Sequence, residues 1–222
     1  MKRKDTQTKP RKAEPLAYSL HWSYCGSCPF KTVCQFKTDG PKCPAVAMGP
    51  KDGKLDYLPK DQYVSEWMPV RLELQQPFPY FVDYPGCNKG FQLFSERFRD
   101  FIEEHKQPKD RFQWLENPVI CGNEERPYFI LHFYDADDVL DESRIVWNTP
   151  TKLDQPDKRT IQVPAFSARK IQGYSIFTYD SGYTFNSDDI YVSKELKQAI
   201  LKAKMTGVKF EATRVTNDLG EE

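Results

Sequence analysis

The chain lacks net charge and long apolar stretches, and each absence excludes a class of protein. Its 32 basic residues are balanced by 32 acidic ones, so it has no overall basic field of the kind expected for a nucleic-acid-binding protein. No stretch approaches the roughly 20 apolar residues of a membrane-spanning helix. The positive start of residues 1–16 is not followed by an apolar run, which excludes a secretory signal. We therefore expect a cytoplasmic protein.

Histidine is scarce, with three in the chain, and the common catalytic motifs are absent. There is no serine-nucleophile elbow, no phosphate-binding glycine loop and no His-Glu-x-x-His zinc motif. A nucleophilic pair of Cys121 and His132 is conceivable, but a small core residue and a satisfied strand residue are the commoner roles in such segments. We therefore expect that the protein is not an enzyme.

Glycine is outnumbered by proline, whereas aromatic residues are plentiful at 14%. Proline interrupts helices and central strands, so we expect short strands, irregular connections and few helices around an aromatic core. Apolar periodicity predicts helices at 91–105 and after Ser193, and a strand at 126–135 that is central in its sheet. The predicted fold class is α+β, with a mostly antiparallel sheet, a few helices and a small N-terminal metal-stapled module. Further strands are predicted at 70–74, 144–149, 159–166, 174–180, near 189–193 and at 208–212.

Four of the six cysteines lie within 20 residues and are candidate metal ligands. A Cys-x2-Cys pair places two thiolates within reach of one tetrahedral zinc ion, and two further cysteines can complete the site. Clustered cysteines in a reducing compartment bind metal more often than they form disulfides. We expect a structural Zn²⁺, with an iron–sulfur cluster or metal-free thiols or disulfides as alternatives, and with His21 able to replace one cysteine. The candidate ligands are Cys25, Cys28, Cys34 and Cys43.

The cysteine cluster and the basic start of the chain suggest its division into parts. Residues 1–12 carry six basic residues and one acidic residue, which predicts a solvated tail and leaves nucleic-acid binding through this end as the alternative function. The predicted parts are a disordered basic tail at 1–16, a four-cysteine zinc module at 17–50, an α+β domain at 51–216 and a flexible C-terminus at 217–222.

The C-terminal sequence from 191 to 215 predicts a capped helix, a glycine stop and a closing strand. This order resembles the C-terminal signature of a bacterial immunity-protein family from polymorphic toxin systems. The segments LFSERFRDFIEE and DESRIVW are similar to the middle region of that family, so the resemblance spans 91–215. The positions that carry the signature are Ser193, Leu196, Thr206, Gly207, Val208 and Phe210.

The resemblance implies a binding protein that neutralises a cognate toxin domain in a direct, stoichiometric complex. Such proteins cover the active site of the toxin or lock it in an inactive state. The signature residues themselves are expected to serve as helix cap, helix stop and core strand, so they identify the fold rather than the binding surface. The four-cysteine module is an addition to the family pattern.

An acidic run follows the strand at 126–135 and is the predicted toxin-binding surface. Toxins that act on nucleic acids carry basic clefts, and an acidic loop can mimic their phosphate ligand. A solvated loop is the alternative, and a calcium loop is a weaker one because the glycine and terminal glutamate of that pattern are missing. Asp180, Asp188 and Asp189 could extend the patch if the loops meet in space. The predicted contact residues are Asp135, Asp137, Asp138, Asp141 and Glu142.

Overall fold

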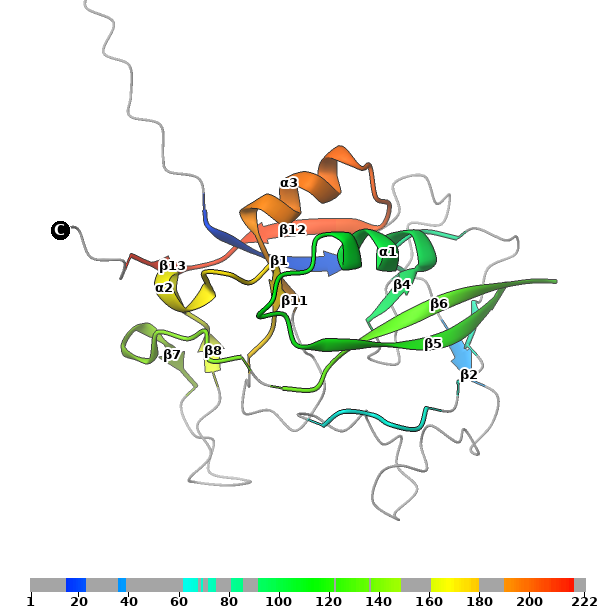
Figure 1. The fold of residues 1–222 in the computed structure, drawn as a ribbon, viewed down its shortest axis with the longest axis horizontal. Helices are drawn as coiled ribbons and strands as arrows, with labels where there is room; N and C mark the ends of the chain where they lie inside the picture. Colours follow the sequence, from blue (N-terminus) through cyan, green and yellow to red (C-terminus); the bar gives the residue numbers. More distant parts are fainter. Residues whose placement is uncertain are drawn as a thin grey trace, which may run out of the picture.

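The described residues form two larger β-sheets, two small sheets and three α-helices (Figure 1). The computed structural model describes residues 15–22, 36–38, 62–67, 69, 72–74, 81–85, 92–121, 123–135, 137–148, 161–179 and 190–217. The helices are α1 (Glu96–Glu104), α2 (Ala168–Ile171), α3 (Lys194–Lys202) and a short 3₁₀ helix, η2 (Glu142–Arg144). The strands are β1 (Ala17–Trp22), β2 (Phe36–Thr38), β3 (Leu72–Leu74), β4 (Leu93–Ser95), β5 (Phe112–Cys121), β6 (Glu124–Phe133), β7 (Val146–Trp147), β8 (Ile161–Val163), β9 (Phe166–Ser167), β10 (Ile176–Phe177), β11 (Ile190–Ser193), β12 (Val208–Ala212) and β13 (Val215–Thr216).

The sheets are mostly antiparallel. One sheet has the strand order β10-β11-β1-β12, and the other has the order β2-β3-β5-β6-β4. Among the described pairs, only β3 with β5 and β13 with β9 run parallel. The predicted α+β class with a mostly antiparallel sheet is confirmed. The cysteines of the predicted metal module lie outside the described residues.

Strand β1 is an internal strand of the four-stranded sheet. Tyr18 pairs with Val192 of β11 on one side and with Ala212 of β12 on the other. The predicted four-cysteine module at 17–50 therefore begins inside this sheet, because residues 17–22 hold β11 and β12 together. Of the remainder of that module, the structure describes only the backbone of β2.

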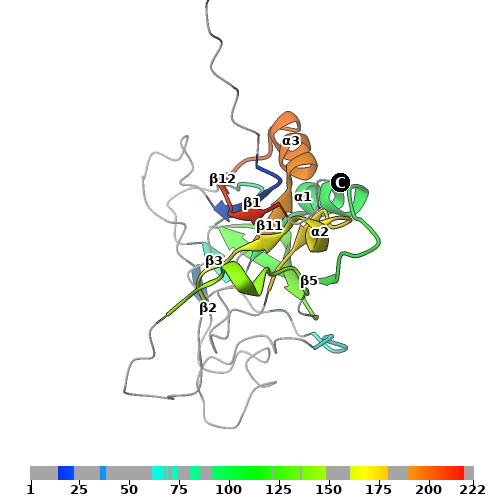
Figure 2. The ribbon, with the colours of Figure 1, turned by 90° about the vertical axis from the view of Figure 1, so that its left-hand side faces the viewer.

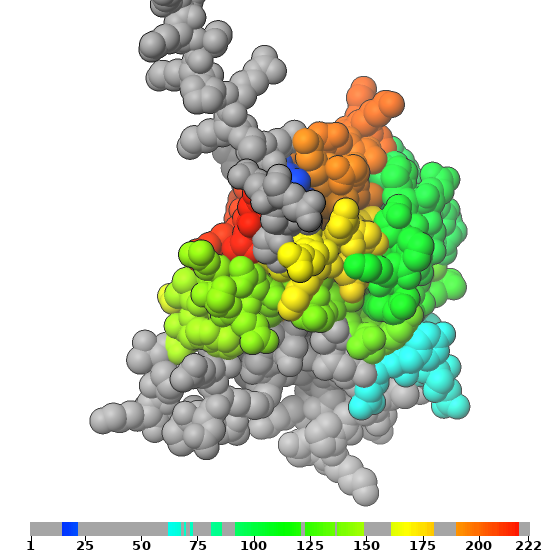
Figure 3. Space-filling view, turned by 60° about the vertical axis from the view of Figure 1, so that its left-hand side comes forward, coloured from blue at the N-terminus to red at the C-terminus, as the bar shows by residue number. Residues whose placement is uncertain are grey.

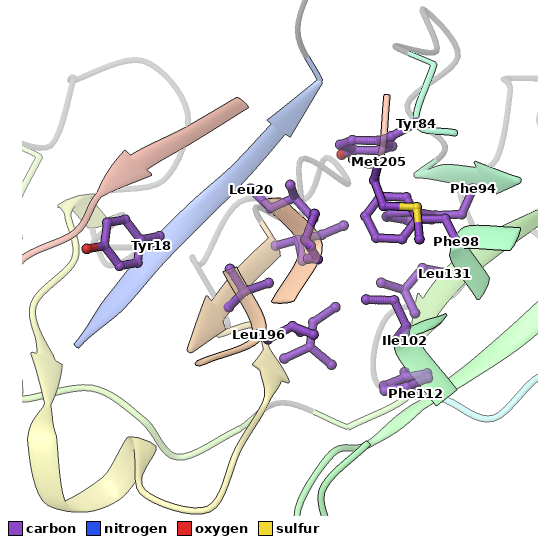
Figure 4. Close-up of a cluster of buried hydrophobic side chains, with 14 of the residues drawn as sticks. Tyr18, Leu20, Tyr84, Phe94, Phe98, Ile102, Phe112, Leu131, Leu196 and Met205 are labelled. Carbon is purple, nitrogen blue, oxygen red and sulfur yellow. The ribbon is translucent and has the colours of Figure 1, made fainter. Parts of the chain in front are cut away.

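One aromatic-rich core joins the two larger sheets to α1 and α3. Successive strand residues point to opposite faces, so Ile176 faces this core whereas Phe177 faces a second cluster with Phe166. Figures 1 and 2 show α1 and α3 close together, and both insert buried side chains into the first core. Figure 4 shows a tight group at one end of that core, formed by Tyr84, Phe94, Phe98 and Met205.

Serine caps set where the two longer helices begin. In α3 the Ser193 hydroxyl accepts the Leu196 amide at 3.1 Å, which confirms the predicted cap. In α1 the Ser95 hydroxyl accepts the Phe98 amide at 3.2 Å. The helix predicted at 91–105 therefore starts only at Glu96, and the residues just before the cap are strand β4 instead. Lys204, with φ of 54°, takes the left-handed position after α3, so the predicted helix stop at Gly207 is wrong by three residues.

The β5–β6 hairpin supplies the middle of the five-stranded sheet. Its register runs from Phe112 opposite Phe133 to Cys121 opposite Glu124. The strand predicted at 126–135 is present as β6, but its predicted central place is wrong because β5 occupies the middle. No strand is predicted from sequence at β5, since Asn117 and Pro118 interrupt its apolar pattern. Asn117 is nevertheless fully buried.

Candidate interaction surface

The acidic run predicted as a single contact surface is divided by the structure into residues with different roles. Asp137 is only 7% exposed. Its carboxylate accepts a hydrogen bond from the Thr178 amide at 3.3 Å and another from the Tyr174 hydroxyl. Asp137 therefore ties the loop before η2 to the end of β10, which a sequence pattern of surface acids does not reveal.

Two further acids of the run are also engaged. Asp138 forms an ion pair with Lys170 at 2.7 Å. Asp141 caps η2, because its carboxylate accepts the Ser143 hydroxyl at 2.6 Å and the Ser143 amide at 3.2 Å. The hydrogen bond from the Ser143 hydroxyl, followed by one from Thr216, lowers the pKa of Asp141.

Asp135 and Glu142 are the remaining members of the run. Both are exposed, and neither forms a hydrogen bond or ion pair with any described residue. The three acids that could extend the patch, at 180, 188 and 189, lie outside the described residues. Of the five predicted contact residues, Asp135, Asp138 and Glu142 are therefore exposed, and Asp137 is buried.

Burial raises the pKa of Asp137 from 3.8 to about 6, although its hydrogen bonds to Thr178 and Tyr174 act in the opposite direction. Burial, followed by the neighbouring Asp137, also raises the pKa of Tyr174 to about 12. A carboxyl whose pKa is higher in the folded state stabilises the fold below its unfolded pKa. That stabilisation is lost as the pH rises through about 6.

The variant Asp137→Asn tests this titration. Its free energy of unfolding relative to the natural protein is expected to rise by about 1–2 kcal/mol between pH 4 and pH 7, because ionising a buried carboxyl costs stability and solvent screens part of the full effect. Urea unfolding at several pH values measures the difference. The matched control is Asp138→Asn, which removes an exposed ion pair and should give a small, nearly constant difference. If the difference in unfolding free energy between Asp137→Asn and the natural protein did not change with pH, Asp137 would already be ionised at pH 4.

A more conspicuous surface lies on the β7–β8 ribbon, where three large apolar side chains are exposed. Val146 of β7 and Val163 of β8 are cross-strand partners, so they share one face of the ribbon. Trp147 follows at a register shift, opposite the buried Ile161. The exposed fractions are 40% for Val146, 39% for Trp147 and 42% for Val163.

A polar hollow of about 370 Å³ adjoins this ribbon. Arg144 lies two residues before Val146, and a guanidinium nitrogen of Arg214 donates to the Arg144 carbonyl at 3.1 Å. Figure 3 shows the surface of the 137–148 segment meeting that of the C-terminal strands. The lining residues are Asp141, Ser143, Arg144, Arg214, Thr216 and Asn217.

The amino-acid sequence does not predict this surface. The segment RIVW and the segment around Val163 have the apolar residues of ordinary strands, and the pattern alone predicts that such residues are buried. The available signal of exposure is that both residues of β7 are apolar. A strand that is buried on one face instead alternates apolar and polar residues. Exposure itself depends on where the ribbon packs, which only the structure shows.

The conceivable pair of Cys121 and His132 is separated by the hairpin register. Cys121 lies opposite Glu124 near the turn, whereas His132 lies opposite Gln113, eight residues further along β5. At about 3.4 Å per residue, these positions are roughly 27 Å apart. The His132 ring donates from Nε2 to the Gln62 carbonyl at 2.8 Å, so it has a structural partner.

His21 lies in β1, beside polar neighbours. Its Nε2 is 2.9 Å from the Ser19 hydroxyl and 4.0 Å from a Glu211 carboxylate oxygen. Both contacts use the same ring nitrogen, so this group lacks the arrangement of a catalytic triad. Within the described ranges, no cluster of three or more His, Cys, Asp or Glu residues could hold a metal ion.

Comparison with known proteins identifies the family of this domain. The sequence model of the immunity protein family Imm11 matches residues 64–215, more than half of the chain and including the whole β7–β8 ribbon. No curated protein matches the chain significantly. In the part of the chain that the structure describes, no helix is long and apolar enough to span a bilayer.

Proposed function

The chain belongs to the Imm11 immunity protein family, and we propose that it binds a cognate bacterial toxin domain and neutralises it in a direct, stoichiometric complex. The exposed apolar group on the β7–β8 ribbon is the observation that supports this contact surface. The proposal assigns the protein no catalytic step. The family match gives the alternative of nucleic-acid binding no support.

The composition of the ribbon surface is that of an interface centre. Binding energy in protein complexes is concentrated in a few residues, with tryptophan and arginine over-represented among them. Here Val146 and Val163 are exposed cross-strand partners, and Trp147 is the exposed neighbour of Val146 in the chain. Arg144 precedes Val146 by two residues and lines the hollow together with Arg214. An apolar group rimmed by polar residues is typical of a binding site.

The acidic run has a reduced part in this proposal. Asp135 and Glu142 are exposed and can attract a basic toxin during encounter, because rim charges act chiefly on the association rate. Asp137 is buried and holds the loop, so it is removed from the set of contact residues. Charge reversal at Asp137 would destabilise the fold and could not serve as a test of the surface.

The variant Trp147→Ala tests the ribbon. We expect its affinity for the cognate toxin domain to fall about 30-fold or more, since loss of a central aromatic residue costs about 2 kcal/mol. Calorimetric titration with a catalytically inactivated toxin measures the dissociation constant. The control is Leu201→Ala, because Leu201 is 53% exposed and belongs to α3, which lies away from β7 and β8 in Figure 1.

The two variants together separate the alternatives. Equal weakening by both would indicate a general loss of stability rather than a specific contact. Natural affinity in Trp147→Ala would place the toxin on another face. No binding by the natural protein would remove the proposed partner.

We also propose that Cys25, Cys28, Cys34 and Cys43 hold a structural zinc ion. Their spacing supports this proposal. In the sequence, Cys25, Cys28 and Cys34 lie between β1 of the four-stranded sheet and β2 of the five-stranded sheet. Metal analysis of the purified protein is expected to give one zinc per chain, and the double variant Cys25→Ser, Cys28→Ser should lose it. Iron and sulfide in place of zinc would support the iron–sulfur alternative, and no metal would remove the proposal.

A further inference from the structure

We propose that the hollow beside the ribbon is a receptor for one carboxylate side chain of the toxin, bound between Arg144 and Arg214. This inference rests on the proposed function and gives that surface a specificity-determining contact. Three features of the hollow lead to it, namely its exposed guanidinium groups without a close ion pair, its net charge and its position.

The two guanidinium groups are available to a partner. Both arginines are exposed, and neither forms an ion pair within 4.0 Å among the described residues, although the charge of Arg144 helps to lower the pKa of Asp141. Arg214 uses one nitrogen for the Arg144 carbonyl, which orients its side chain at the hollow. A guanidinium presents five donors in a planar fork, so several donors are left for a carboxylate.

The other polar side chains that line the hollow already have hydrogen-bond partners within the protein. The Ser143 hydroxyl donates to Asp141, and the Thr216 hydroxyl is within bonding distance of the Phe166 carbonyl at 3.2 Å. Asp141 accepts from Ser143, and the Ser143 and Thr216 hydroxyls lower its pKa. These groups line the hollow together with the two arginines, whose guanidinium groups are its cationic donors.

The charge of the hollow selects the kind of anion. Two guanidinium groups and one carboxylate leave one formal positive charge, which a monoanion neutralises. A phosphate dianion would instead have to approach the Asp141 carboxylate with an unbalanced negative charge. Arginine binds carboxylates through two parallel hydrogen bonds, so an Asp or Glu side chain fits the charge of the hollow.

The position of the hollow joins it to the apolar group. Arg144 is two residues before Val146 and three before Trp147. A partner that covers the ribbon would therefore also cover the mouth of the hollow. Burial strengthens a charged hydrogen bond once the surrounding water is excluded, and the pairing would reject a toxin with a neutral or basic residue at this place.

A charge-swap experiment tests the inference with the inactivated cognate toxin domain. Arg144→Glu and Arg214→Glu are each expected to weaken binding about 30-fold or more, because truncating or reversing a buried charged pair costs 2 kcal/mol or more. Because Arg144 is exposed, the Arg144→Glu variant should keep the unfolding midpoint of the natural protein. Replacing the acidic residues of the toxin one at a time by Arg should yield one variant that restores binding to Arg144→Glu.

The matched control is Arg111→Glu, which makes the same change in net charge at an exposed arginine that donates to the Pro108 carbonyl at 3.1 Å. Natural affinity in both hollow variants, with weakened binding in Trp147→Ala, would overturn the inference while the proposed function stands. Absence of binding by the natural protein would instead contradict the proposed function. Saturable binding of inorganic phosphate at the arginines, without a restoring toxin variant, would also overturn the inference.

Discussion

A chain that lacks residues 1–22 is expected to fail to fold, whereas a chain that lacks only residues 1–14 should fold as the full chain does. The first deletion removes β1, which separates β11 from β12 in the four-stranded sheet. Nine residue pairings with the two neighbouring strands are lost, four with β11 and five with β12. The second deletion leaves β1 intact.

The deletion of residues 1–22 is expected to remove a large part of the free energy of folding. Tyr18 and Leu20 are buried in the main core, and burying a large apolar side chain contributes about 1.5–3 kcal/mol. The deletion also leaves two inner strand edges without hydrogen-bonding partners, which costs further free energy. The total is comparable with the 5–15 kcal/mol that stabilises a typical domain. Insoluble or protease-sensitive protein is therefore the expected result.

Circular dichroism and urea unfolding of the two truncated chains measure the difference. A point variant, Leu20→Ala, should retain the fold and lose about 2–5 kcal/mol. Its control is Leu16→Ala, one of the exposed leucines, which should change stability little. A folded chain without residues 1–22 would show that the family region at 64–215 is complete without β1.

Replacing Gly207 by alanine is expected to destabilise the fold by about 3 kcal/mol, from left-handed strain of about 1–2 kcal/mol and overpacking of similar size. Gly207 has a φ of 80°, and an added Cβ would lie 2.4 Å from the Tyr84 carbonyl oxygen. The turn cannot move away freely, because the Tyr84 amide donates to the Thr206 carbonyl at 3.1 Å. The Thr206 amide and hydroxyl both donate to Asp83.

Gly173→Ala provides the matched control for the contact. Gly173 also has a positive φ, of 88°, but an added Cβ would meet only the flexible Lys109 side chain at 3.5 Å. It should therefore show the strain alone, about 1–2 kcal/mol. Equal losses in the two variants, measured by urea unfolding, would mean that the Tyr84 contact relaxes without cost.

The elements predicted from sequence are those whose signal is local. Ser193 begins α3 because its own hydroxyl caps the helix, and the apolar run of β6 marks a strand wherever it packs. The missed elements depend on distant partners. Strand β5 has a polar interruption at Asn117 that its buried setting accommodates, and β1 is a strand because β11 and β12 flank it.

The same difference between local signals and distant partners explains which parts of the candidate site the sequence predicts. The acidic residues are visible in the sequence, but their roles depend on partners far along the chain, such as Thr178 for Asp137 and Lys170 for Asp138. The ribbon residues look like core in the sequence and are exposed in the fold. Their significance depends on the arrangement of strands, which no local pattern contains.

Growth of cells that express the cognate toxin domain tests the central claim most directly. The natural protein is expected to restore growth and to co-purify with the toxin at a ratio of one to one. The Trp147→Ala variant at equal abundance should restore growth poorly. Toxicity that persists in the presence of the natural protein, with no co-purification, would contradict the account.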